Sequence, residues 1–287
     1  MGTITSLMSL AQQALLADQA GLNVTANNVA NQSTVGYTRE TVSMTAQDVV
    51  NVNSNSSYGD GVTASAPQSQ RNHVLEQQVQ QQMQLQSQSS AVETALDQVQ
   101  NVFGISSTST SSSLTQLGTA VDGFFSSLTA LASNPSDTTT REGVLSSASN
   151  HANTFNSTAA QLTSIGSSLN SQVSTLVGQA NTLTAQIAAL NQQISVVSPN
   201  GDAGVLEDQR QAAIEQLSQI VGLDQITTSA NGIDLTTSNG AALVSGFTSY
   251  PLSTAVVNGQ TQVYDGSANT AGSSSKPSSV ALSLIHI

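Results

Sequence analysis

Residues 162–197 read LTSIGSSLNSQVSTLVGQANTLTAQIAALNQQISVV, the strongest helical signal in the sequence. Its apolar residues recur at alternating spacings of three and four, which is the pattern of one apolar face on a long α-helix. The same register extends back to Leu145, and Pro199 ends it. A helix from Leu145 to Val197 is a rod of roughly 80 Å. We expect it to pack in an intramolecular bundle with the two preceding helices rather than to stand as a free coiled coil.

Four further segments show helical periodicity, at residues 4–29, 71–103, 114–131 and 205–221. Gly104 ends the second of these, and Ser106–Ser113 follows as a Ser/Thr linker. Asn134-Pro135 ends the third, because proline disfavours the α conformation in the residue before it. Ser136 or Asp137 can then cap the long helix. The apolar stripe of the first helix has no obvious local partner, so we expect sister molecules to contact it.

Short β-strands are expected in two places. Thr38–Thr45 and Gly61–Ala66 are rich in β-branched residues, and Asn51–Asp60 between them is typical of a turn or loop. After Gly222 the pattern changes to period two, and Asn-Gly pairs separate the strand-like runs. The strand-like runs are Ile226–Ser229, Ile233–Thr237, Leu243–Val244, Val256–Val257 and Thr261–Tyr264. The Asn-Gly pairs are Asn239-Gly240 and Asn258-Gly259.

These patterns predict a mainly α protein. We expect an elongated helical bundle with long heptad helices, short β elements after the N-terminal helix, and the beginning of a β-rich outer domain. We divide the chain into an assembly helix at 1–36, a helical bundle with a short β segment at 37–222, and the outer domain at 223–287. Residues 266–279 are typical of a loop, and we expect the chain to be cut short, because the apolar run Ala281–Ile287 stops in mid-pattern.

Composition excludes several classes of function. The 287 residues include 5 basic and 17 acidic side chains, a net charge of -12 that repels nucleic acid and anionic membranes. There is no cysteine, and the three histidines are scattered, so we expect no disulfide, metal site or cofactor. Catalytic motifs are missing, and Glu207-Asp208 is expected only to favour a helix dipole. The sequence therefore predicts a protein that is not an enzyme, and the N-terminus is not typical of a cleavable signal peptide.

The most specific motif is the stretch NNVANQSTVGY at residues 27–37. Its Asn and Thr side chains can bond nearby backbone groups and so end the first helix in a defined way. Gly36 permits a backbone angle that is closed to other residues. Tyr37 offers an apolar ring with a polar tip for packing. The stretch has no catalytic logic, so we interpret it as structural.

This stretch resembles the N-N-x-A-N-x-x-T-x-G-Y signature of the bacterial flagellar axial proteins, which include rod, hook and hook-associated subunits. Thr38-Arg39 follows directly, as in the hook-associated proteins, although Glu40 stands where that branch often has Gln. The positions that the resemblance marks as an assembly motif are Asn27, Asn28, Ala30, Asn31, Thr34, Gly36, Tyr37 and Arg39.

Further stretches are similar, in order, to the hook-associated protein 1 (FlgK) family. They are Ser106–Ser113, Phe124–Leu128, Asn134-Pro135 with Arg141, Leu206–Arg210 and Leu217–Gly222. The resemblance implies a structural subunit of the hook–filament junction that self-assembles into a tubular layer outside the cell. It also implies export through the flagellar type III apparatus without a cleaved signal.

The resemblance implies five kinds of partner: sister subunits, the hook protein, the second junction protein, the export apparatus and an export chaperone. A hook or distal rod subunit stays open as an alternative, because such subunits share the signature. From another class, a trimeric adhesin stalk would also show Ser/Thr-rich heptads.

Overall fold

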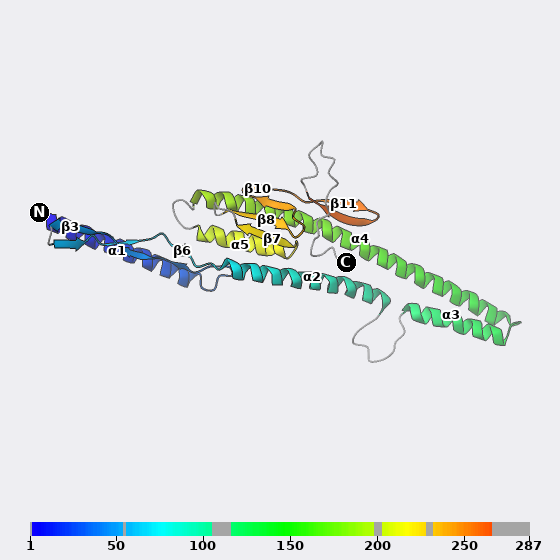
Figure 1. Cartoon of the computed structure of the whole chain (residues 1–287). Helices are drawn as coiled ribbons and strands as arrows, with labels where there is room; N and C mark the ends of the chain where they lie inside the picture. Colours follow the sequence, from blue (N-terminus) through cyan, green and yellow to red (C-terminus); the bar gives the residue numbers. More distant parts are fainter. Residues whose placement is uncertain (1, 54–55, 105–115, 198–202, 228–231, 266–287) are drawn as a thin grey trace, which may run out of the picture.

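The computed structural model describes residues 2–53, 56–104, 116–197, 203–227 and 232–265. The molecule is elongated, with helix α1 and its strands at one end and the α3–α4 hairpin at the other (Figure 1). The helices are α1 (Gly2–Ala30), α2 (His73–Phe103), α3 (Gln116–Ser133), α4 (Thr138–Val197) and α5 (Gly204–Ser218). The predicted fold class is confirmed. The predicted linker at Ser106–Ser113 and the C-terminal segment from residue 266 lie outside the described residues.

Local chemistry fixes the helix ends as the sequence indicates. The Oδ1 atom of Asn72 accepts a hydrogen bond from the backbone N–H of Leu75 at 3.2 Å and so caps α2. Gly104 ends α2 in the left-handed conformation, with φ of 68°. Asp137 caps α4, because its Oδ1 accepts from the backbone N–H of Thr139 at 3.2 Å.

Helix α4 is the central structural element of the molecule, with 60 residues and a length of about 90 Å. Helix α3 packs against its N-terminal half, whereas α5 and α2 pack near its C-terminal half. The expected intramolecular packing is confirmed, but α2 and α3 do not form one bundle at the same level. They lie one after the other along α4 (Figure 1), so α5 takes the place beside α2.

The main hydrophobic core lies where α4 and α5 meet the C-terminal strands. The strands are β7 (Leu223–Thr227), β8 (Ile233–Thr237), β9 (Ala242–Ser245) and β10 (Thr248–Ser249), in the antiparallel order β10-β9-β8-β7, and a separate hairpin of β11 (Ser253–Val257) and β12 (Gln260–Tyr264). The predicted hairpin at Asn258-Gly259 is confirmed, with φ of 53° and 81°. The fully buried side chains of this core include Ile187, Ile214, Leu217, Val221, Leu235, Leu243 and Val244.

Three asparagines of α4 fasten these strands to the helix. The side chain of Asn170 pairs with Gly259 O and Thr261 N–H, and that of Asn181 pairs with both backbone groups of Leu252. Asn191 is 1% exposed and pairs with both backbone groups of Ile233, with Gly246 O and with Arg210. Each amide therefore both donates to the backbone and accepts from it, as a neighbouring strand would.

Residues 40–69 fold back along α1 as one nested antiparallel hairpin, which we call the β extension. Its strands are β1 (Glu40–Thr41), β2 (Met44–Ala46), β3 (Val49–Asn53), β4 (Ser56–Gly59), β5 (Val62–Ala64) and β6 (Gln68–Ser69), paired β1–β6, β2–β5 and β3–β4. The predicted loop at Asn51–Asp60 is wrong, because β3 and β4 occupy most of it. Polar Asn and Ser residues pair there because the flanking β2–β5 ladder sets the register, and strand propensity depends on such context.

The β extension is a local partner for α1, so the expectation that this helix has none is wrong for one of its faces. Ala17 and Val24 are buried, at 2% and 8% exposed. A Cβ atom at Gly61 would lie 2.5 Å from Oε1 of Gln13 and 3.1 Å from Cδ1 of Leu10. Gly61 also has φ of 108°, so both the backbone and the close approach require glycine there.

Candidate assembly site

The opposite side of α1 carries the predicted apolar stripe, and that stripe is exposed. Ile4, Met8, Leu15, Leu22 and Val29, which we call the α1 stripe, are between 60% and 76% exposed. At 3.6 residues per turn, the α1 stripe lies roughly 160° around the helix from the face that packs on the β extension. Helix α1 is therefore apolar on two sides, and the described chain covers only one of them.

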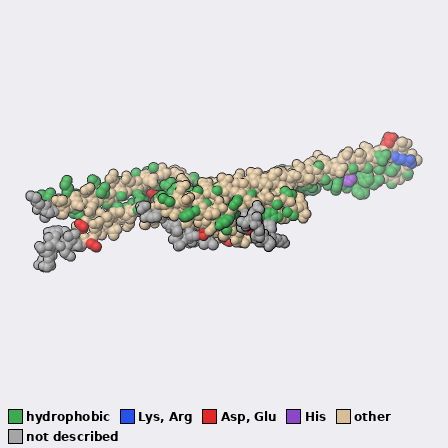
Figure 2. Space-filling model, turned by 90° about the horizontal axis from the view of Figure 1, so that it is seen from above, with side chains coloured by type: hydrophobic (Ala, Val, Ile, Leu, Met, Phe, Trp, Pro, Cys, Tyr) green, Lys and Arg blue, Asp and Glu red, His purple; other side chains and the backbone are tan. Residues whose placement is uncertain are grey.

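Few charges interrupt the surface of the molecule. Figure 2 shows a rod whose visible face is mostly uncharged polar surface and backbone, with hydrophobic side chains scattered along it. Such a surface can pack against a like surface without burying unpaired charge, which is the costly step in association. The surface chemistry is thus compatible with extensive contacts between copies.

Asn28 joins the end of α1 to the first strand. Its Nδ2 donates to the backbone oxygen of Glu40 at 2.8 Å, and its Oδ1 accepts from the Glu40 N–H at 2.9 Å. The hydroxyl of Tyr37 also donates to Asn28 Oδ1, at 2.9 Å. Tyr37 is half-buried, and this burial raises its pKa, as do the carboxylates of Glu40 and Asp208. The phenol therefore stays protonated and keeps donating at neutral pH.

The other motif residues shape the turn after α1. Asn31 Nδ2 donates to the side chain of Asn27 at 2.8 Å and to its backbone oxygen at 3.1 Å, and the Thr34 hydroxyl donates to Asn31 at 3.3 Å. Gly36 has φ of 81°, which confirms the predicted need for glycine. Ala30, the last residue of α1, is exposed.

Unlike Asn28 and Tyr37, which are half-buried, Arg39 has an exposed side chain. Its backbone oxygen accepts from the Gln70 N–H at 2.9 Å, next to the β1–β6 ladder. The motif therefore divides into an inner set around Asn28 and Tyr37 that holds the local fold, and outer residues such as Arg39 that are available for contacts.

A buried ionic cluster connects the motif to α5. The Thr38 backbone N–H and hydroxyl donate to the two carboxylate oxygens of Asp208 at 3.1 and 2.7 Å. Arg71 donates to the same carboxylate and to Glu76 at 2.9 Å, and lies 3.7 Å from Glu207. The Arg71 and Asp208 side chains are only 6% and 13% exposed. The expectation that Glu207-Asp208 serves only the helix dipole is therefore wrong.

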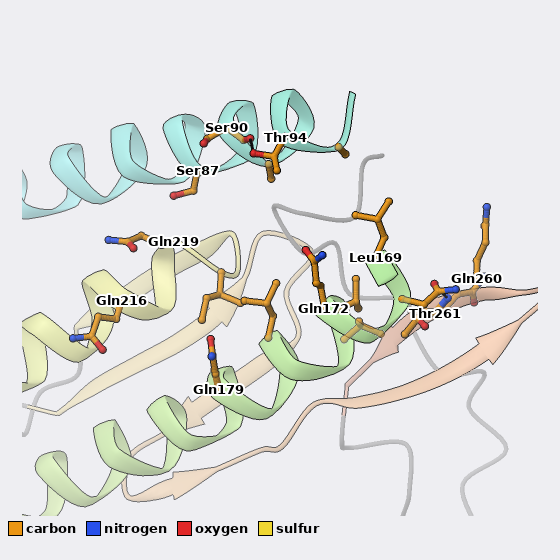
Figure 3. A pocket seen from close by; sticks show the side chains of 18 of the residues that line it. Ser87, Ser90, Thr94, Leu169, Gln172, Gln179, Gln216, Gln219, Gln260 and Thr261 are labelled. Carbon is orange, nitrogen blue, oxygen red and sulfur yellow. Dashed lines mark hydrogen bonds between the residues drawn. The ribbon is translucent and has the colours of Figure 1, made fainter. Parts of the chain in front are cut away.

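An open groove of about 1600 Å³ lies between α2, α4, α5 and the β11–β12 hairpin. Figure 3 shows amide and hydroxyl side chains lining it, among them Ser87 and Thr94 of α2, Gln172 of α4 and Gln216 of α5. Its lining contains no charged residue and no histidine, so it offers no carboxylate, imidazole or amine that could act as a general acid or base on the hydroxyls there.

Within the described residues, no cluster of three or more His, Asp or Glu side chains is placed to hold a metal ion. In the same part of the chain, no helix combines the length and apolar character needed to cross a bilayer.

An elongated rod built on one long helix, with this motif at the end of an exposed apolar helix, is typical of a structural subunit of the bacterial flagellum. Two family models match the chain: the helical domain of the flagellar hook-associated protein FlgK over residues 96–283, and the flagella basal body rod protein over residues 8–38. The chain belongs to the FlgK hook-associated protein family.

Individual relatives agree. The chain is 33% identical to flagellar hook-associated protein 1 of Escherichia coli K12 over 253 residues, which are 87% of this chain and 45% of that protein. It is 30% identical to flagellar hook-associated protein 1 of Bacillus subtilis 168 over 244 residues, 83% of this chain and 47% of that protein. The chain thus spans less than half the length of these relatives.

A solved structure shares the fold. The flagellar hook junction protein FlgK from Burkholderia pseudomallei matches with a TM-score of 0.55 and 29% identity, over 65% of this chain and 33% of that one.

Arg71 and the partners of Asp208 and Asn191 were not identified from the sequence. A pair separated by 170 residues, such as Thr38 and Asp208, leaves no local pattern to find.

Proposed function

We propose that this protein is a structural subunit of the hook–filament junction of the bacterial flagellum, and that its copies self-assemble into a tubular layer. Membership of the FlgK family supports this proposal, as does the likeness to a solved hook junction protein. The observation that carries it is the α1 stripe, which leaves five large apolar side chains exposed along one side of α1. In this role the protein is not an enzyme and needs no cofactor.

Physical reasoning links the α1 stripe to self-assembly. Burying an exposed Leu, Ile, Val or Met side chain contributes about 1.5–3 kcal/mol, so covering the stripe would favour association strongly. Extended apolar surfaces on soluble proteins mark interaction sites. A contact between the stripe of one copy and a different surface of the next is heterologous, and repeated heterologous contacts generate tubes.

The proposed division of labour follows the domain boundaries at 1–36, 37–222 and 223–287. The first segment holds the assembly helix and its motif, and the long α4 helix in the second acts as a stiff spacer. The packing of α1 on the β extension supports one refinement, namely that residues 40–69 belong functionally with the assembly helix.

The proposed partners are sister subunits, the hook protein and the second hook–filament junction protein. On this proposal the subunit reaches the outside of the cell through the flagellar export apparatus, with an export chaperone and without a cleaved signal. A hook or distal rod subunit is the second candidate, since the rod protein model matches residues 8–38. The match of residues 96–283 to the FlgK helical domain favours the junction over the rod or hook.

The test places two lysines on the α1 stripe of the protein, expressed in a flagellated bacterium that lacks its own hook-associated protein 1. We expect Leu15→Lys with Leu22→Lys to abolish swimming in soft agar while the protein still reaches the medium. Asn23→Lys is the matched control, because Asn23 is exposed on the same helix away from the stripe. Swimming at the control level with both stripe lysines present would contradict the proposal.

A further inference from the structure

The molecule divides into two parts that meet at a narrow joint. We call residues 2–69 the arm, because α1 packs mainly on β5 and β1 of the β extension. The body comprises α2, α4 and α5 with the C-terminal strands, which pack on one another, and α3 at the far end of α4. Figure 1 shows the arm extending from the body beyond the start of α2. Only the connection through residues 70–72 carries the chain from one part to the other.

Asp208 lies at this joint and binds both sides of it. Its carboxylate accepts from the Thr38 N–H and hydroxyl of the arm at 3.1 and 2.7 Å. It also accepts from Arg71, in the connection, and Arg71 reaches on to Glu76 in the first turn of α2. One side chain of α5 thus holds the last residues before β1 and the residue that leads into α2.

The surroundings of Asp208 make these contacts strong. Its side chain is 13% exposed and that of Arg71 is 6% exposed, and both carboxylate oxygens of Asp208 are hydrogen bonded. Charge-assisted hydrogen bonds of this kind are shorter and stronger than neutral ones. Glu40 of the arm also approaches the start of α5 closely, since a Cβ atom at Gly204 would lie 2.7 Å from its Oε1. The arm therefore meets α5 at two adjacent points.

We propose that Asp208 is the positioning residue that fixes the direction of the arm relative to the body. Removing its carboxylate releases Thr38 but leaves Arg71 with Glu76 and Glu207, so the body keeps a paired cation. The consequence is a loss of arm orientation rather than a loss of folding. This inference concerns the isolated molecule and does not rest on the proposed role in the flagellum.

The absence of cysteine makes the direct test simple, because two introduced cysteines can carry spin labels without any background. One label pair, at Gln12 and Gln81, reports the arm against the body, and a second pair, at Gln81 and Ser171, reports the body alone; all three positions are exposed. Pulsed electron paramagnetic resonance then gives the distance distribution of each pair in the soluble protein.

We expect Asp208→Ala to broaden the arm–body distribution about twofold, as for two bodies on a flexible linker, and to leave the body pair unchanged. Thr38→Val, which removes the hydroxyl but keeps the N–H, should broaden it less. Asp208→Glu, which restores a carboxylate, should narrow it again. The matched control is Asp224→Ala, since Asp224 is an exposed acid on β7. An unchanged arm–body distribution in Asp208→Ala, or broadening of both pairs, would overturn the proposal.

Discussion

Replacing Asn191 by leucine tests whether a single buried amide holds the C-terminal sheet on α4. The side chain of Asn191 pairs with Ile233 O at 2.9 Å, Gly246 O at 2.8 Å and Ile233 N–H at 3.3 Å. The Asn191 side chain also accepts a hydrogen bond from the Arg210 guanidinium at 3.0 Å. Burial lowers the pKa of this guanidinium, and the opposite effect of the Glu207 carboxylate is smaller. Leucine has the same branched arrangement of four side-chain heavy atoms, so the change removes these hydrogen bonds without opening a cavity.

The magnitude follows from the groups that lose their partner. A buried polar group left unsatisfied costs about 1–3 kcal/mol, and three backbone groups pair with Asn191. Taking the low end for each, because small shifts and water recover part of the loss, we expect Asn191→Leu to lower the free energy of unfolding by about 3–5 kcal/mol. Urea denaturation followed by circular dichroism at 222 nm measures this difference.

Asn170→Leu is the matched control. The Asn170 side chain also bonds one backbone oxygen, of Gly259, and one backbone N–H, of Thr261, but the first of these hydrogen bonds is exposed and the second is only part-buried. Water can replace it, so we expect a loss of only about 0.5–1.5 kcal/mol. Equal losses for the two variants would contradict this prediction, because burial of the amide would then have no influence on the free energy lost.

Two further outcomes are expected. Gly166 lies inside α4 with open space where a Cβ atom would be, so Gly166→Ala should raise the free energy of unfolding by about 0.5–1 kcal/mol. Gly36 has φ of 81°, which alanine adopts only at a cost, so Gly36→Ala should lower the free energy of unfolding by about 1–2 kcal/mol. Thermal unfolding of both variants measures these changes. The raised pKa of Tyr37 stabilises the fold fully below the ordinary value of 10.0, and this contribution is lost as the pH rises through the folded pKa. Urea titrations above and below pH 10 should show the loss, and Tyr37→Phe should reduce it; the same loss in both proteins would contradict the assignment.

The helix boundaries could be predicted because their signals are local. Gly104, Asn134-Pro135 and Asp137 each act on the turn in which they lie, and the structure ends or begins helices at these positions. The Asn258-Gly259 hairpin was predictable for the same reason, since both residues adopt the positive φ that this turn requires.

The remaining features depend on contacts between distant segments. Asn51–Asp60 has the composition of a loop, yet strands form there because the neighbouring β2–β5 ladder sets the register of the chain. Helix α5 packs beside α2 because α3 lies further along α4. The apolar periodicity of the sequence does not specify where along α4 each helix packs.

The candidate site shows the same division. The turn residues of the motif, Gly36 above all, could be assigned from their own chemistry. The partners of Asn28 and Asp208 could not, because Glu40 lies 12 residues from Asn28 and Thr38 lies 170 residues from Asp208. Carboxylates and amides have many possible partners, and only the tertiary structure selects among them.

The asparagines at positions 170, 181 and 191 require the spacing of residues along α4 to match the spacing along the returning chain. They contact successive segments of the returning chain in reverse order, so the number of residues between any two of them is tied to the length of a strand segment. An insertion or deletion between them would rotate and shift one amide away from its backbone partners. Length variation among homologues should therefore concentrate before Asn170, where α3 is the main neighbour and whole turns can be gained or lost in matched pairs.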